Sequence, residues 1–461
     1  MKTSLRFLFF GVFACGWASL WAKPKMNVLF IPVDDLNHWV GYTGRNPQAK
    51  TPNIDRLSKM GVSFSNAHCS APACEPTRAS LFSGLRPSTS GCYLNGHLWK
   101  KYVKEGICLN AHFKDSGYYV MGTGKTYHAS GTSKAAIYEN EWHEYPRLPK
   151  SSTGGASKFQ GYFEPLPLKM KDEDLGDWHS VNYCIEQLGK KRDKPFFLAC
   201  GLIKPHLPWA VPQKYYDMFP RDTIKLPPHL ENDFSDIPKF AHGVGTSGDH
   251  PKFLKSGRWK DAIQSYLATV AFVDVCIGRL LDAIEKSPHK DNTVIVLWGD
   301  HGYDVGEKKF AKSALWEQTT RTPLIIHVPE KLGGSPQAKT CAKPVSLLDL
   351  YPTLLDLCGL PKNPKNEGRS IAPLVRNPKA KWPYPAVITH SPHWHGTNHA
   401  IRSEHFHYIH YGKGGEELYE VAKDPHQWHN LANDPTHATT KAKLKQWLPK
   451  KNAPHFRADK Q

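Results

Sequence analysis

Apolar runs and amphipathic stretches alternate along most of the chain. Runs rich in Val, Ile, Leu and Phe indicate buried strands at residues 26–33, 195–203, 293–298 and 323–328. Residues 266–285 have the periodicity of an amphipathic helix, and other helices are expected to start near residue 52 and to run through residues 80–85. Strands that alternate with helices predict an α/β fold with a largely parallel sheet.

The C-terminal part of the chain has a different pattern. A connection rich in Pro, Lys and Asn spans residues 361–385. Three short strands are expected after it, at 386–390, 405–411 and 417–419, followed by a helix near the terminus. This predicts a catalytic domain over residues 23–380 and a small α+β subdomain over residues 381–461. Two stretches without a regular pattern, 129–177 and 221–259, are expected to form long functional loops.

The first 22 residues have the pattern of a secretory signal peptide. A basic start at Lys2 and Arg6 precedes an apolar run, and Ala22 is a small residue suited to cleavage. That run is too short for an ordinary membrane span, and no later run is long enough, so we expect no integral membrane segment. Cleavage predicts a periplasmic or secreted protein. Lipoprotein attachment at Cys15 is the less favoured alternative, because Phe13 is bulky for such a site.

The charge balance favours an anionic partner. The 461 residues include 60 Lys and Arg against 42 Asp and Glu, a formal net charge of +18. Because export argues against a chromosomal nucleic-acid binder, we expect an anionic polysaccharide and no nucleic acid. Nine of the ten cysteines remain after signal cleavage, and this odd number suggests a special role for one of them.

Carboxylates follow the ends of two predicted strands. Asp34 and Asp35 follow the first strand, and Asp300 and His301 follow the run at 293–298. Ligands of α/β sheets gather at the carboxyl ends of strands, so these side chains are expected to meet. Three carboxylates favour a hard divalent cation. Mg²⁺ is one such cation, and histidine is an unusual ligand for another, Ca²⁺.

Residues 74–78, Cys-Glu-Pro-Thr-Arg, form the most specific motif in the chain. Together with the segments 51–55, 204–208, 299–302 and 417–419, in the same order and spacing, it resembles the type I sulfatases, and most closely their iduronate-2-sulfatase-like branch. In these enzymes the cysteine of the motif is oxidised to formylglycine. The resemblance therefore implies an alkaline-phosphatase-like fold, a Ca²⁺ ion and a maturation enzyme of the formylglycine-generating or radical type.

The resemblance also implies a role for each residue in the hydrolysis of a sulfate ester. A hydrated aldehyde carries two hydroxyls on one carbon: one attacks sulfur, and deprotonation of the other expels sulfate and restores the aldehyde. The implied metal ligands are Asp34, Asp35, Cys74, Asp300 and His301. The implied catalytic residues are Cys74, Arg78 to orient the aldehyde, Lys125 and Lys312 to bind sulfate oxygens, His128 to assist sulfate release, and His206 to protonate the leaving oxygen.

The substrate is expected to be carbohydrate. His393 and His395 are the predicted substrate contacts, because the C-terminal subdomain often borders the pocket in this family. The predicted function is that of an exported sulfatase acting on a sulfated oligo- or polysaccharide of glycosaminoglycan or algal origin. Two alternatives stay open: a phosphonate or phosphate ester hydrolase with the same fold, and a non-catalytic polysaccharide-binding protein in which Cys74 is never matured.

Overall fold

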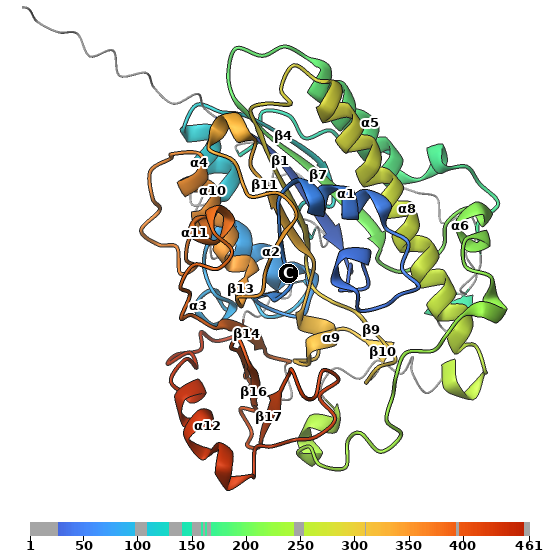
Figure 1. Cartoon of the computed structure of the whole chain (residues 1–461), viewed down its shortest axis with the longest axis vertical. Helices are drawn as coiled ribbons and strands as arrows, with labels where there is room; N and C mark the ends of the chain where they lie inside the picture. The colour runs from blue at the N-terminus through green and yellow to red at the C-terminus, as the bar shows by residue number, and fades with distance from the viewer. Residues whose placement is uncertain are drawn as a thin grey trace, which may run out of the picture.

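A seven-stranded sheet forms the centre of the computed structural model (Figure 1). The structure describes residues 26–96, 108–128, 141–149, 158–159, 162–163, 167–243, 253–308, 310–392 and 396–455. Across the sheet the strands follow the order β12 (Lys339–Cys341), β2 (Val62–Phe64), β11 (Leu324–His327), β8 (Thr293–Gly299), β1 (Asn27–Asp34), β7 (Phe196–Pro205) and β4 (Tyr119–Gly124). Only β11 runs against its neighbours, which confirms the predicted α/β class with a largely parallel sheet.

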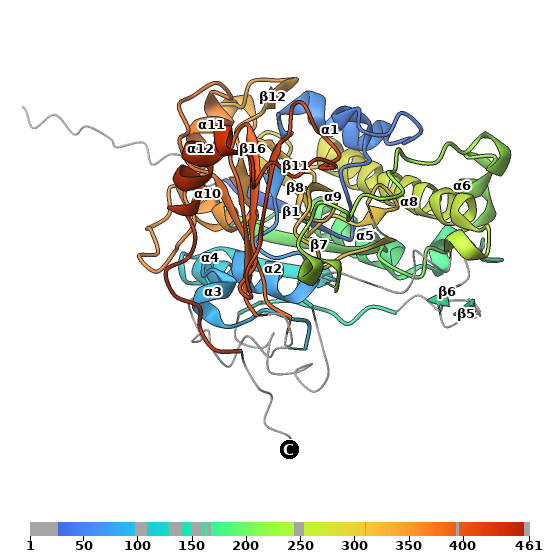
Figure 2. The same ribbon diagram turned by 90° about the horizontal axis from the view of Figure 1, so that it is seen from below.

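Helices cover both faces of this sheet, so its central strands are buried on both sides (Figures 1 and 2). On one face lie α2 (Cys74–Ser83), α4 (Leu109–Asp115), α10 (Leu350–Leu357) and α11 (Ala372–Arg376). On the other lie α1 (Pro52–Met60), α5 (Gly176–Gly189), α6 (Gln213–Asp217) and α8 (Trp259–Lys286). Burial on both faces explains why β1, β7 and β8 have continuous apolar sequences.

The C-terminal subdomain is an antiparallel meander that shares its core with the main sheet. It comprises β14 (Ala386–His390), β15 (Asn398–Arg402), β16 (Phe406–His410), β17 (Glu416–Glu420) and α12 (Ala438–Lys445). One face of the meander, including Tyr408 and Leu418, packs with Leu444 of α12. The opposite face, including Ala400 and Ile409, joins the core of the larger part. The division at residue 380 stays a prediction.

Several further strands and helices are short. They are β3 (Ala67–His68), α3 (Pro87–Ser90), β5 (Lys158–Phe159), β6 (Tyr162–Phe163), β9 (Asp304–Val305), β10 (Phe310–Ala311), α9 (Glu317–Thr320) and β13 (Val345–Ser346). Of the two stretches predicted as irregular, the described part of 221–259 includes two short 3₁₀ segments and a single helical turn at residues 253–255 before α8 begins. The described part of 129–177 includes the β5–β6 pair and the start of α5.

Helix α1 starts at Pro52 as expected, but its first amides are capped from a distant helix. The side chain of Thr51 caps no amide of this helix. Instead, Asp274 of α8 accepts hydrogen bonds from the backbone amides of Asn53 at 3.0 Å and Ile54 at 2.8 Å. Both helices lie on the same face of the sheet, so this contact joins them.

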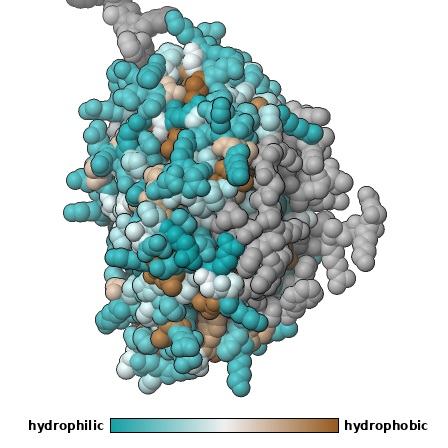
Figure 3. Space-filling view, turned by 90° about the vertical axis from the view of Figure 1, so that its right-hand side faces the viewer, coloured by the Kyte–Doolittle hydropathy of each residue, from teal (hydrophilic) through white to brown (hydrophobic). Residues whose placement is uncertain are grey.

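The nine cysteines that follow residue 25 are all buried free thiols. Among the described residues, no helix has the length and apolar character that crossing a membrane requires. The face shown in Figure 3 is largely hydrophilic where it is coloured, with apolar residues in small separate groups.

Phe30 tests the packing beneath α2. Its ring lies 6.1 Å from that of Phe82 in α2 and 5.4 Å from those of Phe197 and Trp298, measured between centroids. Replacing it with alanine leaves a cavity under the helix that carries Cys74, so Phe30→Ala is expected to lower the free energy of unfolding by about 3–5 kcal/mol. Urea denaturation measures this. Leu226→Ala, at a side chain that is 38% exposed, is the control, with an expected change within about 0.5 kcal/mol.

Candidate active site

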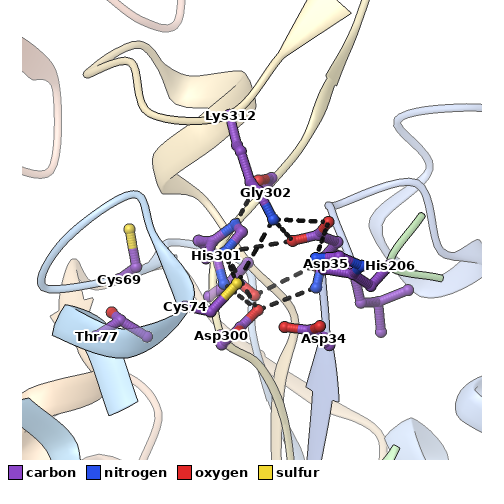
Figure 4. Close-up of polar contacts among 12 residues, drawn as sticks. Asp34, Asp35, Cys69, Cys74, Thr77, His206, Asp300, His301, Gly302 and Lys312 are labelled. Atoms are coloured by element: carbon purple, nitrogen blue, oxygen red, sulfur yellow. Dashed lines mark hydrogen bonds and ion pairs between the residues drawn. The ribbon is translucent and has the colours of Figure 1, made fainter. Parts of the chain in front are cut away.

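Two adjacent parallel strands bring the predicted carboxylates together at one edge of the sheet. Asp34 ends β1, and Asp300 follows the last residue of β8, where Val33 pairs with Gly299. The backbone amide of Asp35 donates to Oδ1 of Asp300 at 3.0 Å. The three carboxylates are completely buried and lie close together (Figure 4). The register of β1 and β8 places Asp34 beside Asp300.

Asp35 adopts an unusual backbone conformation. Its φ of 58° lies in the left-handed region, which Asp tolerates better than most residues. The hydroxyl of Tyr266, from α8, donates to the carbonyl of Asp35 at 2.9 Å and accepts from the amide of Asn37 at 2.9 Å. Helix α8 thereby fixes the sharp turn that follows β1.

Cys74 faces this cluster from the first position of α2. Its Sγ lies 3.3 Å from Nε2 of His301 and 3.5 Å from Nζ of Lys312. The segment before it is held by Thr77, whose hydroxyl accepts from the amides of Ser70 and Ala71 at 3.2 and 3.3 Å. The fourth residue of the motif therefore has a structural role.

Three cations surround the three carboxylates. Nε of Arg78 donates to Asp300 at 2.9 Å, and its Nη2 lies 3.4 Å from Asp34. Lys125, just beyond β4, forms an ion pair with Asp34. Lys312 donates to both oxygens of Asp35, at 2.9 and 3.1 Å. Each buried carboxylate therefore has a cationic partner, which buried charges require.

These neighbours set the pKa values of the acidic groups. Burial alone would raise the pKa of Asp34, but Lys125 and His206 help to hold it well below its ordinary value of 3.8. Burial raises the pKa of Asp300, and the nearby Asp34 adds to the rise. Burial would lower the pKa of His301, but Asp300, Cys74 and Asp35 together outweigh it and raise that pKa to about 10.

The donor set fits a divalent cation. One ligand atom from each of four residues lies within 4.8 Å of the others in two overlapping groups: Asp34, Cys74, Asp300 and His301, and Asp34, Asp35, Cys74 and His206. Half of the residues in these groups offer carboxylate oxygens, which Ca²⁺ and Mg²⁺ prefer. Oxidation of Cys74 would replace its soft sulfur by oxygen, a harder donor, so the modification and the cation are chemically compatible.

Two further histidines lie at this edge of the sheet. Nε2 of His206 is 3.9 Å from Oδ2 of Asp35, and its Nδ1 lies 2.7 Å from the carbonyl of Leu207. Burial, followed by the cationic Lys125, lowers the pKa of His128 to about 4. Within the part of the chain that the structure describes, Nδ1 of His128 is buried without a hydrogen-bond partner.

The structure thus brings together most of the residues singled out from the sequence. These are Asp34, Asp35, Cys74, Arg78, Lys125, His206, Asp300, His301 and Lys312. His128 is close enough to Lys125 for that charge to affect it. The predicted substrate contacts, His393 and His395, lie outside the described residues. Tyr266, which fixes the turn after β1 from α8, belongs to no motif and was not predicted.

Comparison with known proteins gives a family and several relatives. The family model described as Sulfatase matches residues 26–360, and the one described as N-sulphoglucosamine sulphohydrolase, C-terminal, matches residues 299–453. A sulfatase of Formosa agariphila is 38% identical, over 93% of this chain and 87% of that protein. An ulvan-active sulfatase of the same organism is 28% identical, over 93% and 81%. Iduronate 2-sulfatase of Homo sapiens is 27% identical, over 89% and 91%.

Solved structures share the fold. The phosphonate monoester hydrolase of Agrobacterium radiobacter matches with a TM-score of 0.75 at 19% identity, over 92% of this chain and 94% of that one. A protein solved in complex with its substrate D-glucosamine-2-N,6-O-disulfate matches with a TM-score of 0.74 at 20% identity, over 92% and 96%. The expected alkaline-phosphatase-like architecture is therefore confirmed. Because the Sulfatase model matches most of its length, the chain belongs to the sulfatase family and is a sulfuric ester hydrolase.

Proposed function

We propose that this protein is exported and removes sulfate from a sulfated oligo- or polysaccharide, with Cys74 matured to formylglycine. The observation that carries the proposal is the meeting of Cys74 with three buried carboxylates and three cations at the edge of the sheet. A non-catalytic polysaccharide-binding protein has no need to bury so many charges around one cysteine.

The two lysines lie where a sulfate group has to be held. Lys312 is within 3.5 Å of Sγ of Cys74, and Lys125 pairs with Asp34, which Arg78 also contacts. We assign both to the sulfate oxygens, where negative charge grows in the transition state. In the low-dielectric interior such charge stabilisation is stronger than in water.

Arg78 has a positioning role in this proposal. It lies four residues after Cys74, on the same side of α2. Besides its two carboxylate contacts, its Nη1 donates to the carbonyls of Lys125 and Thr126, the latter at 3.1 Å. One buried guanidinium thus joins the helix that carries the nucleophile to the ends of β1, β4 and β8.

Cys74 and its neighbours fit the two groups that the family implies. Asp34, Asp35, Asp300 and His301 would hold Ca²⁺ or Mg²⁺. Such a cation would neutralise the carboxylates and, as a Lewis acid, would polarise the sulfate group. Oxidation of Cys74 would provide an aldehyde whose hydrate offers a hydroxyl nucleophile. The identity of the ion and of the maturation enzyme belongs to the proposal.

The two histidines divide the proton transfers. His206 has a side-chain exposure of 30%, and its Nδ1 bonds to a backbone carbonyl. We assign protonation of the leaving oxygen to its Nε2, which lies 3.9 Å from Oδ2 of Asp35. His128, with a pKa lowered to about 4, is neutral at pH 7 and able to accept a proton. This supports its assignment to the release of sulfate from the enzyme.

Charge and relatives support a carbohydrate substrate. The net charge of +18 suits a sulfated polymer, and relatives that align over most of the chain are named for ulvan and for iduronate. Three further assignments concern residues outside the described ranges. They are substrate contacts at His393 and His395, signal cleavage after Ala22, and the alternative lipid attachment at Cys15. They are part of the proposal.

A panel of defined sulfated oligosaccharides tests the function. We expect the enzyme to release inorganic sulfate from at least one member of a panel drawn from glycosaminoglycans, ulvan and carrageenan, and to leave a matched phosphate ester largely intact. Mass spectrometry of the peptide that spans residue 74 verifies formylglycine, and Cys74→Ala is the inactive control. A formylglycine-containing, metal-loaded enzyme that cleaves none of the sugar sulfates would contradict the carbohydrate assignment.

Removal of the metal is expected to abolish turnover. Without a divalent cation, three carboxylates face an anionic ester, so dialysis against EDTA should lower kcat by about 10²-fold or more, and Ca²⁺ or Mg²⁺ should restore it. Elemental analysis accompanies the assay, and Asp34→Asn, which removes one carboxylate, should show reduced metal content. Full activity in a preparation shown to be free of metal would refute the assigned site.

His206→Ala separates the general acid from the rest of the site. The variant should lose about 10²–10⁴-fold in kcat on sugar sulfates, whose alkoxide needs a proton. It should lose far less on 4-nitrophenyl sulfate, whose phenolate leaves readily. His405→Ala, at an exposed histidine of the C-terminal subdomain, is the control. Equal losses on both substrates would rule out proton donation by His206.

A further inference from the structure

The segment that carries His206 is closed by contacts within itself. The amide of His206 donates to the carbonyl of Ile203 at 2.9 Å, and Nζ of Lys204 donates to the carbonyl of Pro208. Lys204 is only 7% exposed, so its ammonium group lies inside this loop. The backbone around His206 is therefore a compact turn at the end of β7.

This turn starts at an irregularity of the central sheet. Val33 of β1 pairs with Leu202, but the next residue, Asp34, pairs with Pro205. On the other edge, pairing between β4 and β7 ends at Gly201. Ile203 and Lys204 form a bulge between these pairs. Bulges beside active sites redirect the side chains that follow, and their amides need acceptors from outside the ladder.

Asp177 supplies both acceptors. It is the second residue of α5 and is 2% exposed. Its Oδ1 accepts from the amide of Ile203 at 2.8 Å, and its Oδ2 accepts from the amide of Lys204 at 2.8 Å. The positive end of the helix dipole of α5 favours a carboxylate at this place. Burial lowers the pKa of Lys204 to about 8, although Asp177 opposes that shift.

We propose that Asp177 is a positioning residue for His206: its carboxylate holds the two amides of the bulge and so fixes the imidazole over the leaving group. Asp177 is buried behind the turn and acts through the backbone. The inference rests on the proposed role of His206 as general acid. Lys204 completes the same unit, because it closes the turn on the opposite side of His206.

Asp177→Asn is the direct test. The amide keeps the shape of the side chain but replaces one acceptor oxygen with a donor, so one bulge amide loses its partner. A displacement of His206 by about 1 Å would cost about 10²-fold in kcat where protonation of the leaving group matters. The probes are 4-nitrophenyl, phenyl and 4-methoxyphenyl sulfate. We expect the dependence of log kcat on leaving-group pKa to steepen toward that of His206→Ala.

Asp274→Asn provides a matched control. Asp274 is also a buried carboxylate, 1% exposed, that accepts from two consecutive backbone amides, those of Asn53 and Ile54. Burial raises the pKa of Asp274 to about 6, as it does for Asp177. It joins α8 to α1 and does not touch the turn of His206. Its variant should lose stability and keep the leaving-group dependence of the wild type.

A double-mutant cycle shows whether Asp177 acts through His206 or stabilises the site independently of it. In the His206→Ala background, Asp177→Asn should cause no further loss on phenyl sulfate. The same fold loss in both backgrounds, or an equal loss on all three esters, would overturn the proposal. If the wild type accepts no aryl sulfate, the cycle is run on the sugar sulfate that it hydrolyses fastest in the panel.

Lys204→Met provides a second route if Asp177→Asn does not fold. It removes the ammonium contact with Pro208, keeps a side chain of similar length, and should steepen the same dependence. Failure of the proposed function can be distinguished from failure of this inference. In that case a wild-type enzyme that contains formylglycine would hydrolyse none of the sulfate esters. A wild type that is active, with variants of unchanged slope, refutes only the inference about Asp177.

Discussion

The burial of three carboxylates side by side is the constraint on which the rest of the structure depends. Asp34, Asp35 and Asp300 have no exposure to solvent, and uncompensated charges in the interior are strongly destabilising. The compensation comes from three separate parts of the chain: Arg78 from α2, Lys125 from the end of β4 and Lys312 from the segment after β10. The fold therefore has to place all three cationic side chains at one edge of the sheet. The elements that do so also place Cys74 within 3.3 Å of His301.

Much of this arrangement was predictable because the central strands are buried on both faces. Continuous apolar runs revealed β1, β7, β8 and β11, and the polar residues at the ends of β1 and β8 marked the site. Other strands left no such signal. β4 ends in Gly122, Thr123 and Gly124, and β15 reads Asn-His-Ala-Ile-Arg. Their burial comes from packing against neighbours, which the local sequence does not encode.

Residues that carry out the chemistry can be predicted from the sequence, whereas the residues that hold them in place cannot. The motif around Cys74, and the lysines and histidines spaced after it, can be recognised because reacting groups restrict residue type at fixed spacing. Asp177 and Tyr266 act through backbone amides and carbonyls that are distant in sequence. Any chain position that reaches those groups would serve. Their roles therefore become visible only when the strand bulge and the left-handed turn at Asp35 are seen in three dimensions.

The segment that bears Lys312 shows that the support extends into the C-terminal subdomain. The carboxylate of Asp304 accepts from three successive amides, 306 to 308, at 2.9 to 3.4 Å and so shapes the start of this segment.

Lys308 then fixes the segment to its surroundings. Its ammonium group is completely buried, pairs with Asp233 at 2.8 Å and donates to the carbonyl of Gln427 at 2.5 Å. At the other end, Nε1 of Trp316 donates to Glu417 of β17 at 2.8 Å. A lysine that must meet a sulfate group beside Cys74 is thus anchored on both sides by residues beyond position 400. The C-terminal meander is therefore part of the framework that holds the site.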